Sequence, residues 1–195
     1  AKHGVPIISD EIHGDIIFPG AHFTPMLAAC PQYRRHIYTL AAPTKTFNIA
    51  GLKCSYLISD NKETVAAFEA LQQRGNYPKL NVLAITALIA AYSRCADYVD
   101  ALNAYLFDNY QALQAGLNSA YAVMPSQGTF LAFIKVPEGF TDDAFFKAAV
   151  GAGVGVQMGA QFGENGRGYF RLNFGTQRHN VDLAIDRLNQ LVAQH

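Results

Sequence analysis

The chain has 195 residues, of which 50% are hydrophobic and 15% charged, and its 15 basic and 15 acidic residues give a formal net charge of zero. This length is enough for one good core, or for one medium domain and part of another. A neutral chain gives no reason to expect nucleic acid or a membrane surface as a partner. No uninterrupted apolar run is long enough to span a bilayer, and the first residues lack the apolar region of a signal peptide.

The three cysteines are an odd set without the spacing of a metal site. They are typical of reduced thiols in a cytoplasmic protein. Asp10, Glu11, His13 and His22 could be taken for metal ligands, but they too lack the Cys and His spacing of a structural site. We therefore expect no metal and a cytoplasmic location.

The first element in chain order is a short apolar strand over residues 5–10 that ends in Asp10. A carboxylate at the C-terminal tip of a strand in an open α/β sheet points into the crevice where ligands bind. Without further information, a helix or turn cap is an equally good interpretation of Asp10. His13 follows three residues later. It could contact a ligand, or it could simply be a partly buried histidine with a backbone partner.

A run of β-branched and aromatic residues over 36–40 predicts the next strand. Pro43 ends this strand because proline cannot donate to a ladder. Lys45 is then expected on a loop at the C-terminal end of the strand, where open α/β sheets bind ligands. The free amine of a lysine can form a Schiff base with a carbonyl compound. Taken alone, however, a loop lysine is usually a solvated surface charge.

The rest of the chain shows helical and strand patterns in turn. Helices are predicted over 60–74, 80–119, 144–150 and from 179 onward. Strands are predicted up to 58 and over 121–124, 127–134 and 169–174. The aromatic residues and leucines that recur at helical spacing between 98 and 113 are predicted to be core. Thr141 is predicted to cap the third helix.

Three blocks of the sequence resemble one enzyme family. Residues 42–51 read A-P-T-K-T-F-N-I-A-G and are similar to the lysine loop A-P-S-K-T-F-N-I-A-G of the cystathionine β-lyase branch of the class I/II aminotransferases, which are fold-type I pyridoxal-phosphate (PLP) enzymes. Residues 9–15 resemble the S-D-E-I-H-x-D block of that branch, and residues 171–175 resemble its R-L-N-F-G block. The blocks stand in the order of the family and at plausible separations.

The resemblance implies an α/β fold in two domains. Residues 1–100 would be the C-terminal part of the PLP-binding large domain, with a mixed, mostly parallel sheet and helices. Residues 101–195 would be a small C-terminal domain of the α+β type. A full-length member is about twice as long as this chain, so the chain is interpreted as the C-terminal half of such an enzyme.

The resemblance also implies roles for single residues. Lys45 would hold PLP as a Schiff base and act as general base. Asp10 would pair with the pyridine nitrogen of PLP, which makes the ring an electron sink. Arg171 would bind the α-carboxylate of an amino-acid substrate, because a guanidinium offers a planar fork. His13 stands where related aminotransferases have a tyrosine that bonds the phenolic oxygen of PLP.

Two further residues are candidates for the phosphate of PLP. Thr44 is a candidate hydroxyl donor. Lys53 stands eight residues after Lys45, where many aminotransferases have an arginine that binds the phosphate. A lysine supplies the positive charge but not the bidentate fork.

The activity that the resemblance implies is that of a PLP-dependent C–S β-lyase acting on sulfur amino acids. Expulsion of a thiol from the β-carbon would leave pyruvate and ammonia. Two alternatives stay open: an aminotransferase of the same family, and a catalytically inactive C-terminal fragment of such an enzyme. A lysine-dependent aldolase without PLP would need a barrel of βα repeats, which this sequence does not show. The resemblance implies a homodimer for the full-length enzyme.

Overall fold

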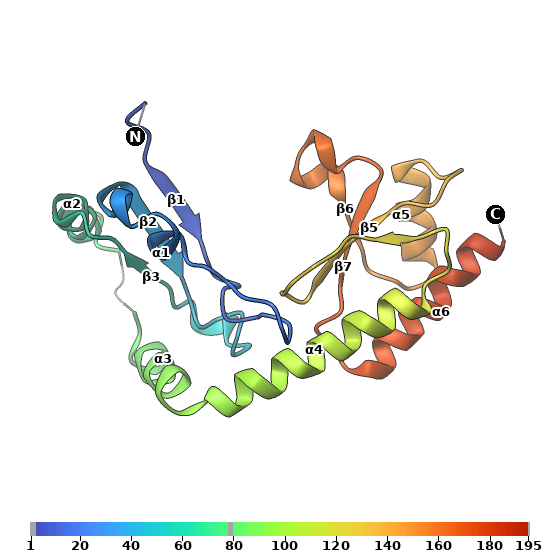
Figure 1. The fold of residues 1–195 in the computed structure, drawn as a ribbon, viewed down its shortest axis with the longest axis horizontal. Coiled ribbons are helices and arrows are strands. Elements are labelled where there is room, and N and C mark those ends of the chain that lie inside the picture. The colour runs from blue at the N-terminus through green and yellow to red at the C-terminus, as the bar shows by residue number, and fades with distance from the viewer. Residues whose placement is uncertain (1–2, 78–79, 195) are drawn as a thin grey trace. The chain divides into compact units, whose positions relative to one another are not determined.

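The computed structural model describes residues 3–77 and 80–194 (Figure 1), and the chain divides into two compact units. The first unit comprises the residues up to Ile17 together with Ala21–Ala101. The second comprises Phe18–Gly20 together with the residues from Leu102 onward. The passage from one unit to the other therefore falls inside helix α4 (Ala96–Gly116).

The first unit contains a three-stranded sheet in the order β1 (Ile7–Asp10), β2 (Ile37–Ala41) and β3 (Tyr56–Ile58). β1 runs parallel to β2, with Asp10 opposite Leu40, whereas β3 runs antiparallel to β2. The strands predicted over 5–10 and 36–40 are confirmed, each beginning one or two residues later than expected. Because β1 and β2 are parallel, the segments that follow them leave the sheet at the same edge.

The helices of the first unit are α1 (Met26–Ala29), α2 (Lys62–Arg74) and α3 (Val82–Arg94), with 3-10 turns at Pro31–His36 and Ala50–Leu52. α2 begins two residues later than predicted because the side chain of Asn61 caps it by accepting the backbone N–H of Thr64. Two large apolar side chains of this helix are exposed, Phe68 by 47% and Leu71 by 60%.

The long helical region predicted over 80–119 consists of two helices, α3 and α4, that meet at Cys95 with a bend of 79°. Within the described ranges, no single helix is long and apolar enough to cross a membrane. α3 and α4 satisfy the length and composition of a span only when they are taken together across this bend. The core predicted between 98 and 113 is correct for Leu106, Tyr110 and Leu113 and wrong for Tyr98 and Tyr105, which are 45% and 44% exposed.

The second unit contains an antiparallel sheet in the order β4 (Ala122–Val123), β5 (Leu131–Lys135), β7 (Tyr169–Asn173) and β6 (Gln157–Met158). Its helices besides α4 are α5 (Asp142–Gly151) and α6 (Arg178–Ala193), which Figure 1 shows beside this sheet. Short 3-10 turns follow β6 at Gly159–Phe162 and Glu164–Gly166. Thr141 caps α5 as predicted, since its hydroxyl accepts the N–H of Ala144.

The two faces of this sheet differ in burial. Ala132, Ile134, Phe170 and Leu172 are buried on one face, where Phe145 of α5 lies with its ring centroid 4.6 Å from that of Phe170. The residues that alternate with them along β5 and β7 point to the opposite face. Arg171 belongs to that second, more exposed face. The strand predicted over 127–134 begins only at Leu131.

Candidate active site

The turn that follows β1 carries the first group of predicted site residues. We call residues 10–16 the Asp10 turn. Asp10 is exposed, and its Oδ1 accepts the N–H of Ile12 at 3.2 Å. The carbonyl of His13, a half-buried residue, accepts the N–H of Ile16 at 3.0 Å, and Ile16 itself is fully buried. The turn is therefore anchored in the core at one end and continuous with the sheet at the other.

The loop that follows β2 carries Lys45. We call residues 43–49 the Lys45 loop. Lys45 is exposed, whereas its neighbours Thr44 and Thr46 are both buried. The loop closes on itself, since Phe47 N–H donates to the carbonyl of Pro43 at 2.9 Å and Ile49 N–H to that of Thr44 at 3.1 Å. The lysine amine is thus open to a carbonyl compound while the backbone on both sides of it is held in place.

A hydrogen bond connects these two segments. The hydroxyl of Thr46 donates to Oδ2 of Asp15 at 3.2 Å. The same carboxylate oxygen accepts the hydroxyl of Tyr92 on α3 at 3.5 Å, and Tyr92 in turn accepts the hydroxyl of Tyr56 at 3.1 Å. Burial, the hydrogen bond with Tyr56 and the charge of Asp15 together raise the pKa of Tyr92 above its ordinary value. These contacts therefore favour the neutral phenol of Tyr92.

Lys53 follows the 3-10 turn at Ala50–Leu52. It is exposed and adopts a left-handed backbone conformation with φ of 51°, and its N–H donates to the carbonyl of Ala50. A residue with a side chain rarely adopts this conformation, which here lets the chain turn from the Lys45 loop into β3. Thr44 and Lys53 thus lie on either side of the same 3-10 turn in the chain.

Arg171 lies in the second unit, on the open face of the sheet. Its Nε donates to Oε1 of Gln157 at 3.0 Å, and its Nη2 donates to the same oxygen. The guanidinium carbon also lies 4.4 Å from the ring centroid of Phe162. A cation placed over an aromatic face is attracted to it. Gln157 and Phe162 therefore define the plane of the guanidinium.

The segment that presents Gln157 and Phe162 depends on close packing of two glycines. A Cβ built on Gly159 would lie 2.1 Å from the carbonyl oxygen of Gly166, which no side chain tolerates. The sequence alone does not single out Gln157 or Phe162. The register of the sheet in the structure does single out Gln157, because Gln157 pairs with Arg171 between β6 and β7.

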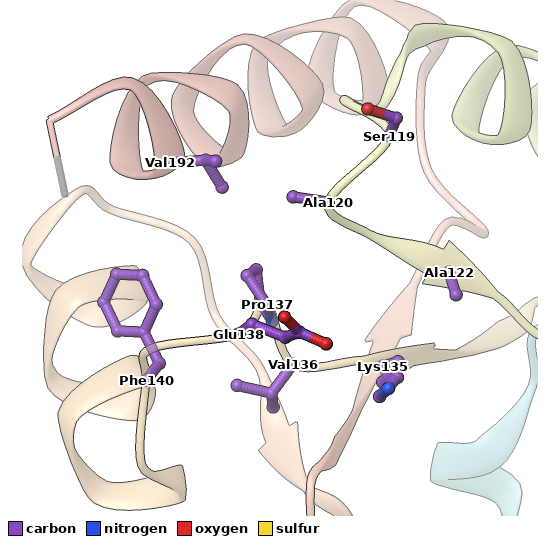
Figure 2. Close-up of a pocket in the computed structure, with 9 residues that line it drawn as sticks. All are labelled: Ser119, Ala120, Ala122, Lys135, Val136, Pro137, Glu138, Phe140 and Val192. Atoms are coloured by element: carbon purple, nitrogen blue, oxygen red, sulfur yellow. The ribbon is translucent and has the colours of Figure 1, made fainter.

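A pocket of about 540 Å3 lies elsewhere in the second unit, between the end of β5 and α6 (Figure 2). None of the predicted site residues lines it. Its lining residues are Ser119, Ala120, Ala122, Lys135, Val136, Pro137, Glu138, Phe140 and Val192. Among residues 3–77 and 80–194, no group of three or more His, Cys, Asp and Glu side chains is arranged to hold a metal ion.

Comparison with known proteins identifies the family. The family model "Aminotransferase class I and II" matches residues 1–188. The chain belongs to this family, as the three sequence blocks predict. It is 34% identical over 192 residues to cystathionine beta-lyase PatB of Bacillus subtilis (strain 168), which is 96% of this chain and 50% of that protein. It is also 34% identical over 190 residues to Protein MalY of Escherichia coli (strain K12), covering 94% of this chain and 48% of MalY.

Other proteins match over about the same share of this chain at lower identity. An asparagine--oxo-acid transaminase of Streptococcus mutans is 27% identical over 205 residues, 96% of this chain and 49% of that protein. The solved structure of a PLP-bound C-S lyase from Staphylococcus hominis superposes with a TM-score of 0.84 at 28% identity, covering 97% of this chain and 47% of that one. The predicted α/β fold of PLP-dependent transferases is thereby confirmed. The chain spans about half the length of the curated relatives it matches.

Proposed function

We propose that this chain is the part of a PLP-dependent C–S β-lyase for sulfur amino acids that holds the Schiff-base lysine, Lys45. The observation that carries the proposal is the placement of an exposed lysine amine on a closed loop that is bonded to the turn beginning at Asp10. The names of the relatives support it, since PatB is a cystathionine beta-lyase and the Staphylococcus hominis structure is a PLP-bound C-S lyase.

The side chains present fit PLP in their chemistry. PLP, when bound, supplies an electron-poor ring that stabilises negative charge at the Cα of an amino acid. Lys45 offers the amine that an aldehyde needs, and Asp10 offers a carboxylate that would hold a proton on the pyridine nitrogen. Thr44 and Lys53 would contact the phosphate, and His13 would contact the phenolic oxygen.

Different residues of the chain would bind the substrate and move its proton. Arg171 would bind the α-carboxylate through its guanidinium, in the plane that Gln157 and Phe162 define. The amine of Lys45 would remove the Cα proton as general base. The bond between Cβ and sulfur then breaks, the thiol leaves with the electron pair and a proton, and hydrolysis of the remainder yields pyruvate and ammonia.

An aminotransferase is the second candidate, because the same residues serve both reactions and the Streptococcus mutans relative is a transaminase. The two activities would diverge after Cα has lost its proton: the lyase breaks the bond between Cβ and sulfur, whereas the aminotransferase keeps that bond and passes the amino group to a 2-oxo acid. We further propose, from the family resemblance, a small amino-acid substrate, a cytoplasmic location and a homodimer for the full-length enzyme. A chain of about half the family length could also be inactive, which the experiment below decides.

Absorbance and labelling test the proposal directly. The purified chain is mixed with PLP, its Schiff-base absorbance band is recorded, and the mixture is reduced with borohydride before peptide mapping. We expect the label on Lys45 and its loss in Lys45→Arg, which keeps the charge but cannot form the Schiff base. Pyruvate release from L-cystathionine would then identify the lyase, whereas amino transfer to a 2-oxo acid would identify the transaminase. A label scattered over surface lysines, unchanged in Lys45→Arg, would overturn the proposal.

A further inference from the structure

Thr46, the residue after Lys45, is fully buried, and its hydroxyl donates to Asp15 Oδ2 at 3.2 Å. A buried hydroxyl needs a partner, and a carboxylate acceptor makes a stronger bond than a neutral one. Asp15 itself is exposed. The carboxylate of Asp15 is therefore in contact with solvent and also accepts the hydrogen bond of the buried Thr46 hydroxyl in the Lys45 loop.

A second set of contacts links the same two segments through Tyr92 of α3, and Tyr98 at the start of α4 adds to the packing of the Lys45 loop. Phe47, two residues after Lys45, meets the ring of Tyr92 edge-on at 5.6 Å between centroids and stacks on Tyr98 at 5.9 Å. Tyr92 also directs its hydroxyl to Asp15. Asp15 is thus bonded both to the Lys45 loop and to the helix side chain against which that loop packs.

Asp15 belongs to the turn that starts at Asp10, so it connects the two segments that would meet PLP. We propose that Asp15 is a positioning residue, which sets the place of Lys45 relative to Asp10 by holding the hydroxyl of Thr46. Its role toward PLP rests on the proposed function of Lys45. The effect of the Asp15–Thr46 hydrogen bond on the Lys45 loop depends on the chain alone, so it can be measured without the cofactor.

Paired substitutions separate the hydrogen bond from packing. Thr46→Val keeps the shape and removes the hydroxyl, whereas Thr46→Ser keeps the hydroxyl and removes a methyl group. Asp15→Ala removes the acceptor at an exposed position. Asp60→Ala is the matched control, because Asp60 is an exposed carboxylate in the same unit whose 2.6 Å ion pair with Arg34 lies outside the site. Each variant is compared with the wild type by hydrogen–deuterium exchange of peptides covering residues 43–49.

We expect exchange in this loop to be faster by about tenfold or more in Thr46→Val and Asp15→Ala, as for the loss of a hydrogen bond to a charged group. Thr46→Ser and Asp60→Ala should stay close to the wild type. With PLP added, the concentration that half-saturates the Schiff-base band should rise by about the same factor in the first two variants and recover in Thr46→Ser.

Two results would overturn the proposal: unchanged exchange in Asp15→Ala, or a larger effect of Thr46→Ser than of Thr46→Val, which would assign the effect to packing. Absence of a label on Lys45 in the wild type would overturn the proposed function instead. The exchange comparison would then still decide whether Asp15 holds the loop.

Discussion

Phe145 determines how firmly the second unit supports the strand that carries Arg171. Its side chain is fully buried, and its ring centroid lies 4.6 Å from that of Phe170, the residue before Arg171 on β7. It also makes edge contacts with Tyr121 and Phe140. Truncation of such a phenylalanine to alanine costs about 3–5 kcal/mol, because the cavity closes only in part. A domain is stable by only about 5–15 kcal/mol, so Phe145→Ala should remove a large share of the stability of this unit.

The neighbouring residue provides the control. Phe146 is 40% exposed, so Phe146→Ala removes the same atoms from a partly solvated position and should cost about 1 kcal/mol. For a unit of this size, about 1 kcal/mol corresponds to a Tm shift of about 4–8 °C. In thermal unfolding followed by circular dichroism, we expect a decrease of at least about 12 °C for Phe145→Ala and less than about 8 °C for Phe146→Ala. Equal decreases would refute the packing described for α5.

Three other predictions concern the site and the pH dependence of stability. Lys45→Arg should abolish the borohydride-stable PLP label at this position, as read by peptide mass spectrometry, because a guanidinium forms no Schiff base with the aldehyde. Arg171→Lys should raise KM for the amino acid by about tenfold or more with a smaller change in kcat, since lysine lacks the planar fork, and steady-state kinetics measures both constants. Burial raises the pKa of Tyr121 from 10.0 to about 12. The stability that its neutral form contributes is therefore complete below pH 10 and is lost as the pH rises from 10 toward 12. We expect the urea midpoint of the wild type to fall over that range and that of Tyr121→Phe to fall less.

Local chemistry was enough to predict the segments that carry the site. A β-branched run followed by Pro43 predicts a strand that ends just before a loop, and β2 does end at Ala41. Thr141 is followed by acidic residues and an apolar run, and it caps α5 as expected. These features depend on residues a few positions apart, so the sequence contains all that determines them.

The features that the sequence did not reveal depend on distant residues. Tyr92 lies 77 positions from Asp15, and neither side chain carries a local signal that the other is its partner. The sequence also does not predict the break at Cys95, because helical residues continue on both sides of it without a glycine or proline. Tyr98 is predicted as core because periodicity shows which residues share a face, but periodicity does not show that this residue stacks on Phe47 and stays half-exposed.

The contrast between Lys45 and Thr46 explains why a sequence motif predicts the chemistry of a site better than it predicts the geometry of that site. The side chain of Lys45 is exposed, as the proposed Schiff-base role would require, so few of its own contacts can define its position. Its position is instead determined by the buried residue beside it, and the contacts of that residue come from elsewhere in the chain. Arg171 follows the same logic, since Gln157 and Phe162 orient its guanidinium from a separate strand and turn. Substitutions at Asp15, Thr46, Gln157 and Phe162 should therefore alter the placement of the reactive groups while leaving the groups themselves intact.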